Sequence, residues 1–335
     1  MKKILLATTM LASVAGYAAA DVAVSGDARM GVVSTEGNSI FESRMRIKFS
    51  GTGTTDGGLA FGGSFRAADA NGANDGTKGS VFISGAFGKI SMGDVDSGDE
   101  AAVGQLSSVG YEGLGSTNSI SYAADGGAVG LTDSWIEVGN GEGAKVLYTY
   151  SAGALTLNAS SGQLTNNEYY SSQSYGVGAA YTTGALTLAV GYGSNELTGY
   201  INYDGGYEGS VSLTDISASV AYVMGDTTVK AIYQDKEAEI SYDNWTGNLG
   251  DAVSMGASVD HKMDALTLTA FAITTEFSSD FENFDVSLNR YGVGASYDLG
   301  GGASFKAGWA EVEALSNDYE VASQSAFDAG VNFSF

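Results

Sequence analysis

The chain has 335 residues with no Pro and no Cys, and its 15 basic against 39 acidic residues give a formal net charge of −24. Without Cys, neither a disulfide framework nor a cysteine zinc site is possible, and an anionic chain of this size repels nucleic acid. Charged residues make up only 16% of the chain, against about 25% in ordinary soluble domains. This low fraction indicates that a medium other than water contacts much of the surface.

The first twenty residues have the pattern of an export signal. Lys2 and Lys3 supply the positive end, residues 4–15 the apolar stretch, and residues 18–20 a cleavage site of small residues. Cleavage after Ala20 leaves 13 basic and 39 acidic residues, a net charge of −26. We expect residues 21–335 to form one domain.

From residue 22 onward, apolar and polar residues alternate with a period of two, which is typical of strands with one apolar face. Phe41, Met45 and Phe49 share one parity, whereas Arg44 and Arg46 share the other. No later stretch is apolar for 18 residues, so a membrane-spanning helix is not expected. The pattern predicts sixteen strands, at residues 22–34, 42–53, 58–70, 78–87, 89–95, 144–152, 154–162, 173–183, 185–195, 213–224, 226–236, 251–262, 264–276, 286–298, 303–312 and 326–335.

The connections alternate in length. Tight turns rich in Gly or Asp, such as residues 85–88 and 300–302, are typical of hairpins. Between them lie longer polar connections, of which residues 96–143 form the longest. A connection of this length inside a compact fold is usually functional or disordered. We therefore expect one end of the structure to be short and the other elaborate.

A soluble β-sandwich with its apolar parity turned inward is the alternative interpretation. Strands of about ten residues instead match a tilted span of a bilayer, and an even number of antiparallel strands closes without a free edge. Aromatic residues also occupy the positions just before tight turns, as an interfacial girdle requires: Phe87, Tyr150, Tyr181, Tyr222 and Tyr297. The sequence therefore predicts an all-β fold, a sixteen-stranded antiparallel transmembrane β-barrel, and sixteen strands enclose a channel.

Four segments carry a family resemblance: residues 25–32 (SGDARMGV), 84–90 (SGAFGKI), 147–153 (LYTYSAG) and 297–304 (YDLGGGAS). The chain resembles the sixteen-stranded general-diffusion porins of Gram-negative outer membranes, most closely those of Rhodobacter-like photosynthetic bacteria. The resemblance implies homotrimers with one pore per subunit, embedded among outer-membrane lipid and lipopolysaccharide and passing small hydrophilic solutes. It also implies that residues 96–143 fold into the barrel as a constriction loop and that Phe335 is an outer-membrane assembly signal.

Charged residues suggest how such a constriction would be built. We expect a basic wall on three adjacent strands, formed by Arg29, Arg44, Arg46, Lys48 and Arg66. We expect an acidic side on or beside the loop, formed by Asp94, Asp96, Asp99, Glu100 and Glu112. Facing charges would create a transverse field that orients dipolar solutes. Alternatively, the basic residues only keep the lumen wet. The net negative charge favours cations unless the basic wall dominates locally.

Other chemistry has weaker support. Carboxylates of external connections, such as Asp235, Glu237 and Glu239, are candidates for holding Ca²⁺ through oxygen ligands. Their spacing matches no ordered loop motif, which favours a solvated face instead. No cofactor is expected. His261 is the only histidine and has no serine or cysteine motif to activate, so we do not expect an enzyme. A channel selective for one class of solute and a surface adhesin with a soluble β fold stay open as alternatives.

Overall fold

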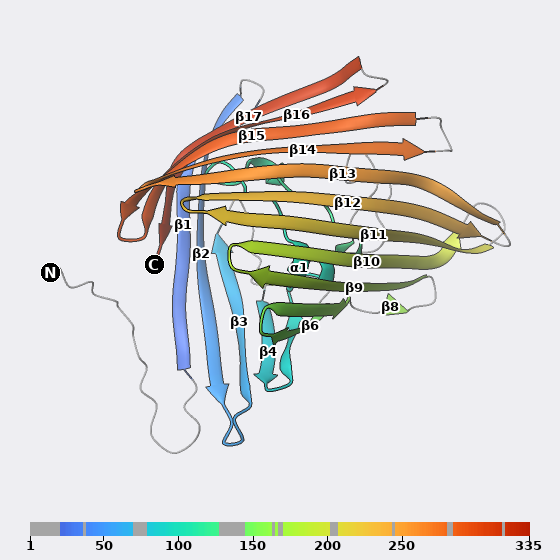
Figure 1. The fold of residues 1–335 in the computed structure, drawn as a ribbon, viewed down its shortest axis with the longest axis horizontal. Helices are drawn as coiled ribbons and strands as arrows, with labels where there is room; N and C mark the ends of the chain where they lie inside the picture. Colours follow the sequence, from blue (N-terminus) through green and yellow to red (C-terminus); the bar gives the residue numbers. More distant parts are fainter. Residues whose placement is uncertain are drawn as a thin grey trace.

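We analysed the protein in a computed structural model (Figure 1). The structure describes residues 21–35, 38–69, 79–126, 145–162, 165–166, 170–201, 207–242, 245–279, 284–316 and 319–335. The predicted signal segment, residues 1–20, lies outside the described residues. So does the second part of the long connection, residues 127–144.

The described residues are almost entirely strand. The strands are β1 (Asp21–Thr35), β2 (Asn38–Thr54), β3 (Ala60–Asp69), β4 (Gly79–Gly85), β5 (Gly88–Gly93), β6 (Lys145–Ala152), β7 (Leu155–Ser161), β8 (Thr165–Asn166), β9 (Tyr170–Thr183), β10 (Leu186–Ile201), β11 (Tyr207–Met224), β12 (Thr227–Tyr242), β13 (Trp245–Met263), β14 (Leu266–Ser279), β15 (Phe284–Gly300), β16 (Ala303–Ser316) and β17 (Tyr319–Ser334). Three short helices follow β5: α1 (Gly98–Val103), η1 (Leu114–Ser116) and η2 (Ala123–Asp125).

The strands form one closed antiparallel sheet, because β1 pairs with β2 on one side and with β17 on the other. The two-residue strand β8 pairs with β9 beyond the point where β7 ends, so β7 and β8 occupy one position in the ring. The barrel therefore has sixteen positions, as the alternation predicts. The C-terminal residue completes the closure, since the backbone groups of Phe335 and Gly26 exchange two hydrogen bonds of 2.7 and 3.0 Å.

Each of the sixteen predicted strands is present, and several extend into predicted connections. Residues 196–212 were expected to be a connection, yet β10 continues to Ile201 and β11 begins at Tyr207. Likewise β12 runs to Tyr242, so the predicted connection at residues 237–250 is mostly strand. Backbone pairing with the neighbouring strand satisfies peptide groups even where side chains are polar, which is why the polar stretches did not mark the strand ends.

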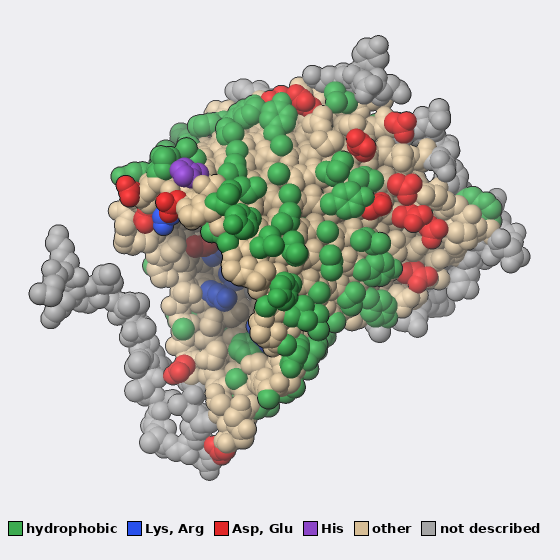
Figure 2. Space-filling view, in the orientation of Figure 1, with side chains coloured by type: hydrophobic (Ala, Val, Ile, Leu, Met, Phe, Trp, Pro, Cys, Tyr) green, Lys and Arg blue, Asp and Glu red, His purple; other side chains and the backbone are tan. Residues whose placement is uncertain are grey.

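The apolar parity points away from the lumen. Phe41, Met45 and Phe49 of β2 are exposed on the outer face, whereas Arg44 and Arg46 between them are partly buried inside. Figure 2 shows hydrophobic side chains spread over the outer face and a hollow in which Lys and Arg side chains are visible. A soluble sandwich would bury the apolar parity, so that interpretation is wrong. In the described part of the chain, no helix is long and apolar enough to cross a membrane.

Candidate functional site: the lumen and its inner loop

The connection after β5 enters the lumen. We call its described part, residues 94–126, the inner loop. Helix α1 packs against the inward faces of β7, β9, β10 and β11, and η1 lies against β16 and β17. The inner loop thus follows the wall from β7 round to β17 (Figure 1).

Glycines on the wall make room for this loop. Gly176 and Gly178 of β9 pair with Gly193 and Gly191 of β10, which leaves a block of bare backbone under α1. A Cβ atom at Gly178 would lie 2.5 Å from both the Ala102 Cβ and the carbonyl oxygen of Gly98. Any side chain here would therefore push α1 off the wall. We call Gly176, Gly178, Gly191 and Gly193 the glycine surface. It was not predicted from the sequence, although the four glycines share the inward parity.

Apolar contacts fill the space between loop and wall. The loop side chains are buried in one cluster with inward residues of β10, β12, β14 and β16. They are Val103, Leu106, Val109, Leu114, Ile120 and Tyr122 from the loop, against Ala189, Ile232, Phe271, Ile273 and Ala310 from the wall. Since inward positions of a channel are expected to be polar, these apolar inward residues mark where the loop covers the lumen face.

Cations of the wall also hold the loop backbone. Lys230 donates hydrogen bonds to the carbonyl oxygens of Val103 and Gln105, at 2.6 and 3.0 Å. Lys236 and Arg290 donate to the carbonyl oxygens of Ser121 and Ser119. These cations are committed to fixing the loop, and they are not free to contact solutes.

The far part of the loop is fixed by Asp328 of β17, whose side chain is fully buried. Its Oδ2 atom accepts hydrogen bonds from the backbone N–H groups of Tyr111 and Glu112, at 3.0 and 3.1 Å. Asn332 donates to the carbonyl oxygen of Tyr111. The inner loop therefore reaches the strand next to β1, beside the predicted basic wall.

Arg29 joins this end of the loop to the basic wall. Its guanidinium contacts Glu42 at 2.5 Å and Glu112 at 3.1 Å. Burial, followed by the nearby Glu42 carboxylate, raises the pKa of Glu112 to about 7. Burial likewise raises the pKa of Tyr111 to about 12. Of the five acidic residues predicted to oppose the basic wall, Glu112 is the one whose contact with an arginine is described.

The remaining basic residues face the lumen. Arg44 has a long contact of 3.5 Å to Asp27. Among the described residues, Arg46, Lys48 and Arg66 have no carboxylate within 4.0 Å. The structure thus leaves these three cations directed at the open lumen.

Asp99 and Glu100 point to the opposite side. Asp99 is completely buried on α1, and this burial raises its pKa to about 7. Burial and hydrogen bonding with Asp125 raise the pKa of Glu100 to about 8. Although burial opposes it, hydrogen bonds with Glu100 and Lys145 hold the pKa of Asp125 below its ordinary value.

Other predicted residues lie at the margins. Asp94 and Asp96 are exposed where the chain leaves β5. Asp235, Glu237 and Glu239 lie on the exposed outer face of β12 instead of in a connection, which corrects their predicted placement. No group of three or more His, Asp or Glu side chains suited to a metal ion occurs in the part of the chain that the structure describes.

The chain is similar to known proteins in its family pattern, its sequence and its fold. The family model of Gram-negative porins matches residues 7–317. A porin of Rhodobacter capsulatus is 36% identical over 323 residues, which covers 94% of this chain and all of the relative. A porin of Fuscovulum blasticum is 24% identical over 330 residues, again covering 94% of this chain and all of the relative.

Solved structures agree. A porin structure superposes with a TM-score of 0.72 at 32% identity, covering 94% of this chain and all of the other. The OmpT outer-membrane protein of Vibrio cholerae, at 18% identity and a TM-score of 0.71 over 95% of this chain and all of its own, shares the fold. With a closed barrel, an apolar exterior and a charged lumen, this chain belongs to the Gram-negative porins, outer-membrane barrels that form water-filled channels for the passive diffusion of small hydrophilic solutes.

Proposed function

We propose that solutes pass between the inner loop and the basic wall of β1–β3, with Arg44, Arg46, Lys48 and Arg66 lining the passage. One observation carries this proposal: the loop is bonded to the inward face of β7–β17, while the cations of β2 and β3 face the lumen without described carboxylate partners, apart from the long Arg44 contact. Ions and small polar solutes keep most of their water in such a passage, whereas apolar solutes lose theirs without replacement.

The acidic side of the predicted transverse field is weaker in this arrangement. Asp99 and Glu100 face β7–β11, and Glu112 is compensated by Arg29. We therefore infer a passage whose field is dominated by the basic wall, and not the cation preference that the net charge alone favours. A reversal potential measured across a KCl gradient tests this: chloride preference supports the inference, and potassium preference contradicts it.

Passage itself is tested by liposome swelling. Liposomes that contain the protein should swell in isotonic solutions of small sugars, and the rate should fall as the sugar becomes larger. Liposomes without swelling would contradict a diffusion channel. Steady swelling with a single sugar and none with its neighbours in size would favour a channel selective for one class of solute.

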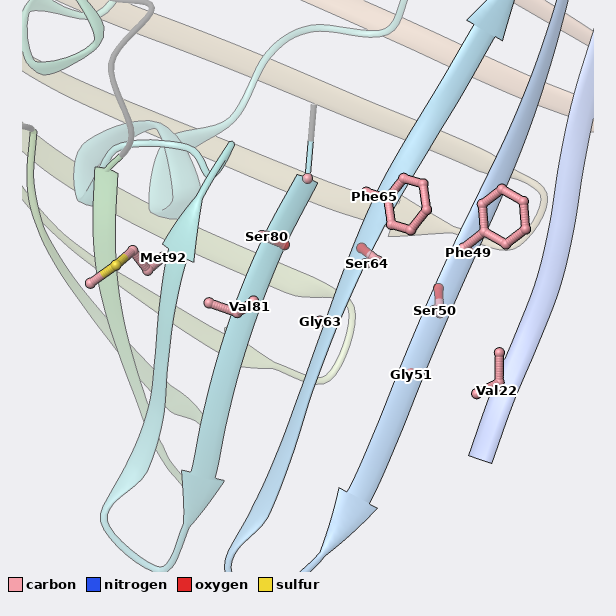
Figure 3. Close-up of a pocket in the computed structure, with 11 residues that line it drawn as sticks. Val22, Phe49, Ser50, Gly51, Gly63, Ser64, Phe65, Ser80, Val81 and Met92 are labelled. Atoms are coloured by element: carbon pink, nitrogen blue, oxygen red, sulfur yellow. The ribbon is translucent and has the colours of Figure 1, made fainter. Parts of the chain in front are cut away.

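We infer that three copies associate through the outer face of β1–β5. Strands β4 and β5 have 7 and 6 residues, fewer than the roughly 9 residues that a strand needs to cross a bilayer. A neighbouring subunit can pack against β4 and β5, which are too short to cross the bilayer on their own. The same face carries a pocket of about 590 Å³, shown in Figure 3, where Gly51 and Gly63 lie beside the stacked rings of Phe49 and Phe65.

A gel assay tests the association. A trimer should migrate as one large species in detergent until it is boiled, and then as a single chain, whereas migration as a monomer before boiling would contradict it. Outer-membrane lipid and lipopolysaccharide are the expected surroundings of the trimer.

Three further predictions belong to this proposal. Residues 1–20 are expected to be removed after export, and Phe335 is expected to act in assembly. Calcium binding at Asp235, Glu237 and Glu239 stays a prediction, to be tested by calcium chelation. We also infer that the protein is not an enzyme, since its single histidine, His261, lies on the outer face of β13 against Thr227.

A further inference from the structure

Arg46, Lys48 and Arg66 are brought together by strand pairing. Arg46 and Lys48 are two residues apart on β2, and Lys48 is directly opposite Arg66 on β3. Side chains in these positions start about 5 to 7 Å apart on the same face. Like charges directly opposite one another are destabilising in a sheet, so this arrangement calls for a compensating anion.

The protein supplies little compensation in the described residues. Asp27 is opposite Arg46 on β1, but its Oδ1 atom is directed to Arg44 at 3.5 Å. The carboxylates of Glu42 and Glu112 are occupied by Arg29. Four inward cations beside the inner loop differ: Lys145 is paired with Asp125, and Lys230, Lys236 and Arg290 bind carbonyl oxygens of the inner loop.

We propose that Arg46, Lys48 and Arg66 form a binding site for a phosphate group inside the channel, carried either by inorganic phosphate or by a small phosphate monoester. The planar fork of an arginine matches phosphate oxygens with two parallel hydrogen bonds, and a lysine adds a point charge. The proposal rests on the channel function, because the ligand reaches these side chains through the lumen.

We expect this site to bind phosphate weakly. It is open to lumen water, so salt screens it, and a conducting channel must release what it binds. A phosphate group held here narrows the passage while it is bound. Its binding is therefore visible as a reduction of the current carried by smaller ions.

Single-channel recordings in planar bilayers test the site. The recordings use 0.1 M KCl, in which the Debye length is about 10 Å. The current of the wild-type channel should decrease as inorganic phosphate is added at constant ionic strength, and the decrease should saturate. The double variant R46Q/R66Q should need at least a tenfold higher phosphate concentration for the same reduction. Glycerol phosphate is the second probe: a reduction by both probes assigns the site to the phosphate group, and a reduction by inorganic phosphate alone assigns it to the free ion.

The matched control is K262Q/K306Q, which removes two inward lysines of β13 and β16 outside this cluster and should keep the wild-type response. R46K/R66K keeps both charges but loses the forks; it should give an intermediate response and serves as the second variant if R46Q/R66Q forms no channels. A wild-type current insensitive to both probes overturns the proposal, and so does a control that loses the response as fully as R46Q/R66Q. Absence of any channel in KCl alone would instead count against the proposed function.

Discussion

Two parts of the barrel wall share one strand pattern and serve opposite purposes. Inward positions of β9–β16 carry glycines and apolar side chains, and the inner loop covers them. Inward positions of β2 and β3 carry Arg46, Lys48 and Arg66, which stay in the lumen. Alternation therefore determines the barrel, whereas the size and charge of the inward residues decide which part of the wall is covered and which part faces the passage.

Removing the anchor of the loop at β17 should have the largest effect. Asp328→Ala leaves the buried N–H groups of Tyr111 and Glu112 without their acceptor, at a cost of roughly 2 kcal/mol each. We expect hydrogen exchange at the inner loop to accelerate about a thousandfold and single-channel current to become larger and noisier. Asp328→Asn keeps an acceptor and should lie between. Exchange in Asp328→Ala as slow as in the wild type would contradict this role.

Packing against the covered wall should have the next largest effect. Leu106 is 3% exposed, whereas Leu188 on the outer face is 47% exposed. Leu106→Ala should destabilise the docked loop by roughly 3 kcal/mol through lost contacts and a cavity. Leu188→Ala is the matched control and should leave exchange at the inner loop unchanged. Equal acceleration in the two variants would mean that the loop is not packed on this wall.

A substitution in the glycine surface under α1 should have a smaller effect. Gly178→Ala places a methyl group 2.5 Å from the carbonyl oxygen of Gly98, whereas at Gly51 a Cβ atom has no neighbour within 4 Å. Overpacking of this kind costs roughly 2 kcal/mol. We expect mass spectrometry to show faster exchange over α1 in Gly178→Ala and no change in Gly51→Ala. Identical protection of α1 in both variants would mean that α1 does not pack closely on the glycine surface.

The smallest effect concerns pH. Asp99 and Glu100 have pKa values of about 7 and 8 because they are buried, whereas a released loop would expose them with ordinary values near 4. The docked loop thus binds more protons between about pH 4 and 8, so its stability should fall as pH rises through that window.

The expected change is roughly tenfold, equivalent to about 1.4 kcal/mol, in exchange at α1 between pH 5 and pH 8, after correction for the intrinsic rate. Asp99→Asn combined with Glu100→Gln should abolish the dependence. A loop better protected at pH 8 than at pH 5 would reverse the sign and refute the assignment of these groups.

Much of the fold was predictable because the alternation of Phe41, Met45 and Phe49 with Arg44 and Arg46 depends only on the period of a strand. The inward direction of Arg29 followed from the same parity. The position of Asp99 did not, since parity says nothing about a loop, and whether a loop carboxylate faces lumen or wall depends on packing against distant residues such as Gly193. The glycines of β9 and β10 carried that information, but only in combination with the strand register.

The chain has no natural cysteine, so single introduced thiols report directly on the two parts of the wall. Arg46→Cys and Ser217→Cys both place a thiol on an inward position, the first beside the passage and the second, at a fully buried site, under the inner loop. Reaction with a water-soluble methanethiosulfonate reagent should be at least tenfold faster at position 46 and should change the single-channel current. Equal rates at the two positions would contradict a passage bounded by the basic wall on one side and the docked loop on the other.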